Sequence, residues 1–162
     1  MRFFVQVIIV VALIVQPIQA ASPLHPKKGT VPFDNCTMKH HVSSLFRFAD
    51  LPEAVRTDLT DRAGTLAGRG EPFNSTDVVT NGDGPGRRFI RAVQSEDNLF
   101  VWYEHGGIGL HVHVLAYDIG RASGIPLQSA PANLEANYVT FNPCAATDAY
   151  LDGVYPAAEG DF

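Results

Sequence analysis

Three stretches in the middle of the chain have the hydrophobic pattern of β-strands, in which apolar side chains alternate with polar ones or follow one another without a break. These stretches are residues 88–94, 99–105 and 110–118, and a fourth, shorter one is 138–142. The connections 95–98 and 106–109 have the length and the Gly, Asp and Asn content of hairpin turns. The pattern therefore predicts an antiparallel meander.

Before these strands, the apolar residues recur at the spacing of an α-helix. Residues 51–66 carry apolar side chains at helical spacing, and the opposite face is charged. Asp50 is placed to cap the start of this helix, Glu53 completes a capping-box pattern, and Gly64 is placed to end it. We expect an α+β fold in which one N-terminal helix packs on an antiparallel sheet of three to four meandering strands.

The start of the chain predicts its location. Met1 and Arg2 precede an apolar run from Phe3 to Val15, and small residues follow at Ala20 and Ala21. This is the order of a secretory signal peptide, and the run is shorter than the roughly 20 residues that span a bilayer. We expect cleavage after Ala20, a secreted or periplasmic protein, and no membrane association after processing.

The sequence has two cysteines, Cys36 and Cys144, which lie 108 positions apart. In an oxidising compartment an even pair predicts a single disulfide. Neither cysteine has a partner at metal-ligand spacing, which disfavours a zinc site built on them. A loop of this length corresponds to about 4–5 kcal/mol of stabilisation on the chain-entropy account.

These features divide the chain into four predicted parts. They are a signal peptide at 1–20, an extended lead-in at 21–49, an α+β domain at 50–144 closed by the disulfide, and an acidic, flexible tail at 145–162. Asn35 and Asn74 begin glycosylation sequons, and whether they are used depends on the source organism.

Charge and motifs restrict the function only loosely. The formal net charge is −5, so the overall field does not attract polyanions, and we expect a nucleic acid only as a substrate. No motif identifies a cofactor. We therefore expect a binding or interaction domain, whose partner is an unidentified extracytoplasmic protein or small ligand. The alternative is a small extracytoplasmic hydrolase or a metal-binding protein.

The alternative depends on the predicted strand register. Hairpin loops of two or four residues would place Gln94 opposite Leu99 and His105 opposite Leu110. One sheet face would then be apolar. The other face would gather a guanidinium, an indole, a carboxylate and two imidazoles, which belong to Arg91, Trp102, Glu104, His111 and His113. In this register Glu104 lies opposite His111, and Trp102 lies between Arg91 and His113.

This face permits a structural interpretation and a catalytic one. Its members could simply form ion pairs and stacked contacts on a sheet surface. As a hydrolase, Glu104 or one histidine would act as the base and the other histidine as the acid. Arg91 would stabilise an anionic transition state. A helix followed by a sheet with these residue types resembles the small secreted microbial ribonucleases in architecture, although no motif matches.

A metal site is the third interpretation. His111 and His113 share a face, and with Glu104 they could bind Zn, Mn or Fe, although Arg91 would oppose a cation. The His-x-His pair before an acidic residue is similar to the cupin motif. Here the acid is Asp118, the leading glycine spacing differs, and no second histidine motif follows. His105, beside the glycine-rich turn, is either a strand-end residue or, with Trp102, part of a ligand-binding surface.

Overall fold

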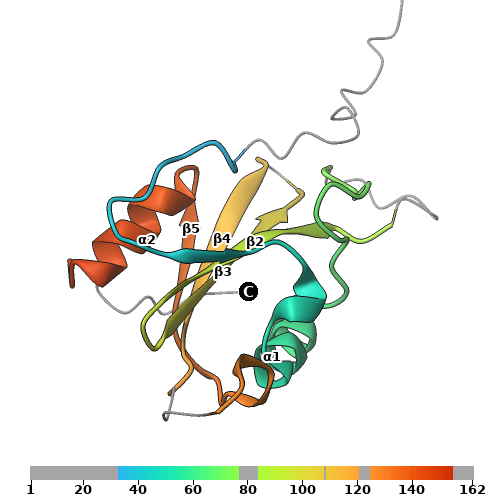
Figure 1. The fold of residues 1–162 in the computed structure, drawn as a ribbon. Helices are drawn as coiled ribbons and strands as arrows, with labels where there is room; N and C mark the ends of the chain where they lie inside the picture. Colours follow the sequence, from blue (N-terminus) through green and yellow to red (C-terminus); the bar gives the residue numbers. More distant parts are fainter. Residues whose placement is uncertain (1–32, 77–83, 108, 121–124, 155–162) are drawn as a thin grey trace, which may run out of the picture.

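The computed structural model describes residues 33–76, 84–107, 109–120 and 125–154. Within them lie two α-helices, α1 (Glu53–Ala63) and α2 (Pro143–Leu151), and the short 3-10 segments η1 (Phe48–Asp50) and η2 (Leu127–Ser129). The five strands are β1 (Ser43–Leu45), β2 (Arg87–Ser95), β3 (Asn98–His105), β4 (His111–Asp118) and β5 (Asn133–Thr140). They form one antiparallel sheet in chain order (Figure 1).

The α+β class and the antiparallel meander are confirmed, and two elements correct the prediction. Strand β1 lies in the stretch predicted as an extended lead-in and pairs with β2. Helix α2 occupies the start of the stretch predicted as a flexible tail. Its N-cap is Asn142, whose side-chain oxygen accepts a hydrogen bond from the backbone N–H of Ala145, and Pro143 stands in its first turn. The sheet thus has five strands rather than three to four.

Helix α1 is shorter than predicted at both ends. Its N-cap residue is Pro52, without a side-chain cap, whereas Asp50 belongs to η1, so the predicted capping box at Asp50 is wrong. Gly64 ends the helix with a φ of 71°, a conformation that favours glycine. The predicted apolar face is confirmed, because Val55, Leu59 and Ala63 are buried.

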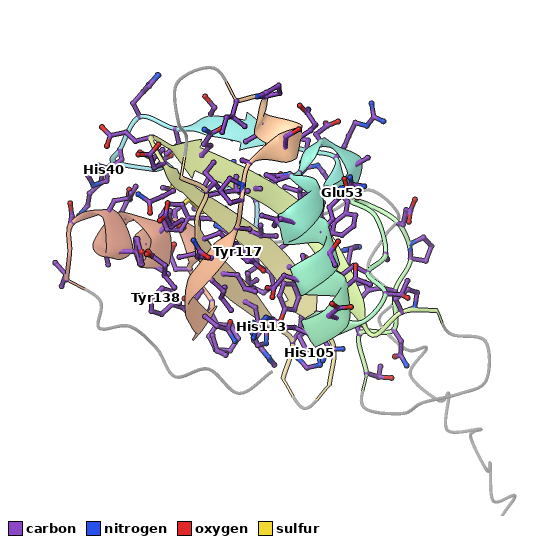
Figure 2. The ribbon with its side chains drawn as sticks, turned by 90° about the horizontal axis from the view of Figure 1, so that it is seen from below. His40, Glu53, His105, His113, Tyr117 and Tyr138 are labelled. Carbon is purple, nitrogen blue, oxygen red and sulfur yellow. A yellow bond between two sulfur atoms is a disulfide. The ribbon has the colours of Figure 1, made fainter. Side chains whose placement is uncertain are left out.

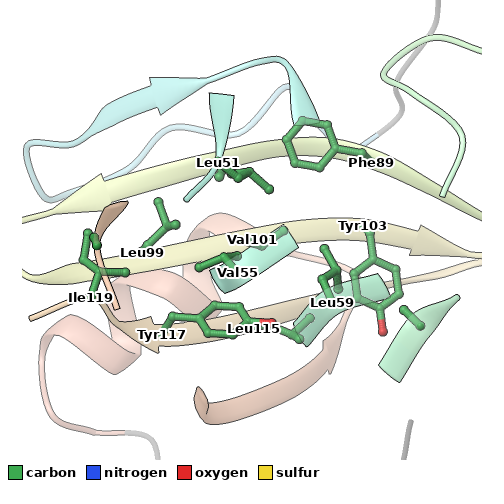
Figure 3. Packing of buried hydrophobic residues seen from close by; sticks show 13 residues of the cluster. Leu51, Val55, Leu59, Phe89, Leu99, Val101, Tyr103, Leu115, Tyr117 and Ile119 are labelled. Atoms are coloured by element: carbon green, nitrogen blue, oxygen red, sulfur yellow. The ribbon is translucent and has the colours of Figure 1, made fainter. Parts of the chain in front are cut away.

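The sheet is covered on both faces, with α1 on one side and α2 on the other (Figure 1). We call these sides the α1 face and the α2 face. On the α1 face, the helix packs against strand residues that include Phe89, Val101 and Leu115 (Figure 3). On the α2 face, Phe100, Trp102 and Val114 form a second core with α2 and Cys144. The face on which the sequence places Arg91, Trp102 and Glu104 is therefore covered by α2 and is not open to solvent (Figure 1).

The β2–β3 register is as predicted from Arg91 to Ser95, with Gln94 opposite Leu99, but a bulge at Ile90 shifts the pairing so that Phe89 lies opposite Tyr103 rather than Glu104. The β3–β4 register is not, because His105 lies opposite His111 across a connection of residues 106–110. This one-residue difference from the predicted register moves every side chain of β4 to the opposite face of the sheet, since side chains alternate between the faces of a strand. His111 and His113 consequently lie on the α1 face, and Glu104 lies opposite Val112 rather than His111.

The predicted disulfide between Cys36 and Cys144 is present, with the two Cα atoms 5.9 Å apart. It ties the segment before β1 to the first turn of α2. The predicted signal peptide at 1–20 lies outside the described residues. Within the described ranges, no helix has the length and apolar character needed to cross a membrane.

Candidate functional site

Three histidines meet at one end of the sheet. His105 ends β3, His111 begins β4, and His113 follows two residues later on the same face. One nitrogen of each ring lies within 4.8 Å of the others, and among the described residues this cluster includes no carboxylate and no cysteine. Figure 2 shows His105 and His113 side by side at this end, away from Glu53 at the start of α1. The one-residue difference from the predicted β3–β4 register places His111 and His113 on the same face as His105.

Hydrogen bonds fix the two rings of β4. His111 Nδ1 lies 2.7 Å from the carbonyl oxygen of Gly109, which can only accept, so this nitrogen carries the proton. His113 Nδ1 lies 3.0 Å from Oδ1 of Asn137 on β5 and donates in the same way. A neutral ring with its proton on Nδ1 carries a lone pair on Nε2. The two Nε2 atoms are 3.2 Å apart.

Burial keeps the imidazole of His113 uncharged. The ring is 3% exposed and is stacked on Tyr103, with the centroids 4.7 Å apart and the planes 2° from parallel. Burial lowers the pKa of His113 to about 4, and His111, His105 and Arg87 add to this effect while Asn137 opposes it. Burial also lowers the pKa of the more exposed His105. Both rings are therefore prepared to bind a ligand through a lone pair.

Arg87 lies next to His105 on the α1 face, on the side away from His111. It starts β2 directly opposite His105, and its Nη1 donates to the carbonyl oxygen of Ala63 at 2.7 Å. Ala63 is the last residue of α1, where the helix dipole is negative and favours a cation. Arg87 also hydrogen-bonds Tyr103, whose pKa burial nonetheless raises to about 12. The guanidinium is thus held beside the histidines by two neighbours.

The remaining predicted site residues lie on the opposite face. Arg91 stacks on Trp102 at 4.2 Å, so the predicted contact between these two is present. The indole N–H of Trp102 donates to Thr147 of α2 at 3.1 Å, in the second core rather than beside His113. The sheet therefore separates Arg91, Trp102 and Glu104 from the three histidines, and the predicted single constellation does not exist.

Glu104 forms an ion pair of its own. Its Oε2 accepts from Arg88 Nη2 at 2.7 Å, and both side chains are almost fully buried. Arg88 in turn lies over the ring of Phe73 at 4.5 Å. Burial raises the pKa of Glu104, and Arg88 opposes that rise. Since Glu104 faces away from the histidines, it cannot complete their ligand set.

Sequence reasoning missed three neighbours of the cluster, namely Arg87, Tyr103 and Asn137. Tyr103 was expected on the apolar face, where it does lie, but without the histidines. Arg87 and Asn137 stood just outside the predicted strands, which were taken as 88–94 and 138–142. Extending those strands by one residue each would have placed both side chains in the sheet.

Similarity to known proteins gives no further guidance. No protein family, no curated protein and no solved structure matches this chain. What the protein does must therefore be inferred from the chemistry of its own residues.

Proposed function

We propose that the protein binds a divalent transition-metal ion, with zinc as the best fit, through His105, His111 and His113. The observation that carries this proposal is the 3.2 Å separation of the His111 and His113 Nε2 atoms, which face each other with lone pairs when both rings are neutral. Two such atoms repel unless a proton or a metal ion lies between them. Burial lowers the pKa of His113 to about 4, so His113 does not supply that proton at neutral pH.

The spacing matches zinc coordination. Zinc–nitrogen bonds are about 2.0–2.1 Å long, so two tetrahedral ligands have their nitrogens about 3.3 Å apart. His105 is half-buried and its nitrogen lies within 4.8 Å of the other two, so its ring must move closer to act as the third ligand. A set of neutral imidazoles suits Zn, Cu, Fe or Ni rather than Mg or Ca.

Three protein ligands leave a fourth position of a tetrahedral ion for water or a substrate. An ion bound this way polarises a ligand or lowers the pKa of bound water to about 7. The chain's own residues orient the ligands, with Gly109 and Asn137 fixing the protonated nitrogens and Tyr103 stacking on one ring. This supports the hydrolase alternative, with a metal in place of the predicted Glu104 base.

We also propose that the protein works outside the cytoplasm, as its first twenty residues predict. The disulfide between Cys36 and Cys144 supports this location, because such bonds persist in oxidising compartments. Binding of a partner protein stays a prediction.

Calorimetric titration of the chelator-treated, oxidised protein with Zn²⁺ tests the metal site. We expect one ion per chain, and a loss of more than about 100-fold in affinity in His111→Ala and His113→Ala. His41→Ala is the matched control, because that exposed imidazole lies before β1 and outside the cluster. Equal affinity in all four proteins, or no saturable binding, would overturn the proposal.

A further inference from the structure

Arg87 has no obvious place in a metal site, because its positive charge repels the ion. It nevertheless stands directly opposite His105 on the same face, and its charge acts on both His105 and His113. Its Nη1 is held by the carbonyl of Ala63, while its buried Nε has no hydrogen-bond partner among the described residues. A buried donor without a partner is costly, so a ligand that accepts a hydrogen bond from Arg87 would stabilise this arrangement.

The charges at the site point to the nature of that acceptor. Three neutral imidazoles leave a divalent ion with its two positive charges, and Arg87 adds a third. Among the described residues the cluster contains no carboxylate to balance them. The end of α1 opposes this charge with a partial negative charge of about one half. An anion bound from solution would therefore neutralise part of this charge.

An exposed apolar side chain, which we call the apolar rim, lies beside the histidines. Val139 on β5 lies directly opposite His113 on β4, so their side chains share the α1 face. Val139 is nevertheless 60% exposed, because α1 covers the sheet elsewhere. A ligand at the fourth metal position would thus have a cation on one side and an exposed apolar side chain on the other.

We propose that the site takes an organic carboxylate, with one oxygen on the metal ion, the other accepting from Arg87, and an apolar substituent over Val139. This inference rests on the proposed metal site. A guanidinium suits this role because it stays charged and donates charge-assisted hydrogen bonds to a carboxylate oxygen. The apolar rim favours a carboxylate with a hydrocarbon group over inorganic phosphate, because phosphate has no apolar group that could contact Val139.

Titrating the Co²⁺-loaded protein with acetate, benzoate and phosphate at constant ionic strength tests the inference, with the visible absorption of Co²⁺ as the readout. We expect benzoate to bind tighter than acetate and phosphate. Arg87→Gln should weaken benzoate by about tenfold or more, while Arg47→Gln, at an exposed arginine near η1, should leave it unchanged. Arg87→Gln should bind Co²⁺ at least as tightly as the parent, since it removes a repelling charge.

Two further variants guard against a folding defect. Arg87→Lys keeps the charge and should retain most of the benzoate affinity, and Val139→Thr should lower the preference for benzoate over acetate. Equal benzoate affinity in the parent and Arg87→Gln, or a preference for phosphate, would overturn the carboxylate site. Failure to bind Co²⁺ before any anion is added would instead overturn the metal site itself.

Discussion

Asn137 on β5 holds His113 on β4 through a 3.0 Å contact between Oδ1 and the ring Nδ1. The contact decides which ring nitrogen is protonated and leaves Nε2 as the lone pair that faces His111. Both residues are buried, at 4% and 3% exposure, so water cannot readily replace the amide. Asn137 is therefore a positioning residue for the proposed metal site.

Replacing Asn137 should weaken metal binding without removing a ligand. We expect Asn137→Ala to lower Zn²⁺ affinity by about 10–100-fold, the usual effect of losing a partner behind a metal-bound histidine. Asn137→Asp keeps the acceptor and should retain binding. Nitrogen chemical shifts of the His113 ring in the metal-free protein provide the second readout, and Asn137→Ala should shift the ring toward the other tautomer. Unchanged affinity and unchanged shifts would show that Asn137 does not orient the ring.

Glu104 provides the sharpest contrast between the predicted and the observed site. The sequence placed it among the metal ligands, whereas the structure pairs it with Arg88 on the other face. We expect Glu104→Gln to leave Zn²⁺ stoichiometry and affinity unchanged. The same substitution should lower the free energy of unfolding by about 3–5 kcal/mol, because it breaks the buried ion pair between Glu104 and Arg88.

A double-mutant cycle separates the ion pair from the packing of its members. Replacing Glu104 and Arg88 together by methionine should cost less than the sum of the two single replacements, since no uncompensated charge remains. Unfolding in urea measures all four proteins. Additive effects would mean that the two side chains are not coupled, and a loss of zinc in Glu104→Gln would return Glu104 to the metal site.

The two hairpins show why sequence predicted one register and not the other. Ser95 pairs with Asn98 across the two-residue turn Glu96-Asp97, so a short polar turn fixed the predicted alignment. Between β3 and β4 the glycines allow a connection of four or five residues. From Val112 to Tyr117 every residue is apolar except His113, because both faces of the sheet are buried, so hydrophobicity could not choose between the two alignments.

Helix α2 was missed for a related reason. Its residues are mostly small, and alanines give little periodic contrast. Asn142 followed by Pro143 was the available signal, since an N-cap residue before a proline is typical of a helix start. The isolated helix α1 was predicted because large apolar residues recur along one of its faces. Composition and spacing thus identified the elements in which apolar and polar positions clearly alternate. The site depended on the β3–β4 register, which the hydrophobic pattern did not determine.

Removing the disulfide should test the fold without disturbing the candidate site. We expect the double replacement of Cys36 and Cys144 by alanine to lower the free energy of unfolding by about 2–5 kcal/mol. The bond lies on the α2 face, beside Trp102 in the second core, whereas the histidines lie on the α1 face. Zn²⁺ affinity should therefore stay unchanged at temperatures where the variant is folded. A parallel loss of zinc binding and stability would show that the two faces are coupled.

The free energy of unfolding should also fall at alkaline pH, because the tyrosines Tyr103 and Tyr117 are buried. Tyr117 donates to Asp58 Oδ2 at 3.0 Å, and burial together with this carboxylate raises its pKa well above 10.0. Burial raises the pKa of Tyr103 from 10.0 to about 12. A phenol whose pKa is higher in the folded chain contributes its full stability below pH 10 and loses it as the pH rises through the folded value. Both phenols therefore act in the same direction.

The free energy of unfolding, followed in urea at increasing pH, should be insensitive to these phenols below about pH 9.5 and should decline above about pH 10. Tyr117→Phe should cost about 1 kcal/mol at neutral pH, for the lost hydrogen bond, and should make the alkaline decline shallower. An identical alkaline slope in Tyr117→Phe and the parent would show that the Tyr117 phenol does not contribute to the pH dependence.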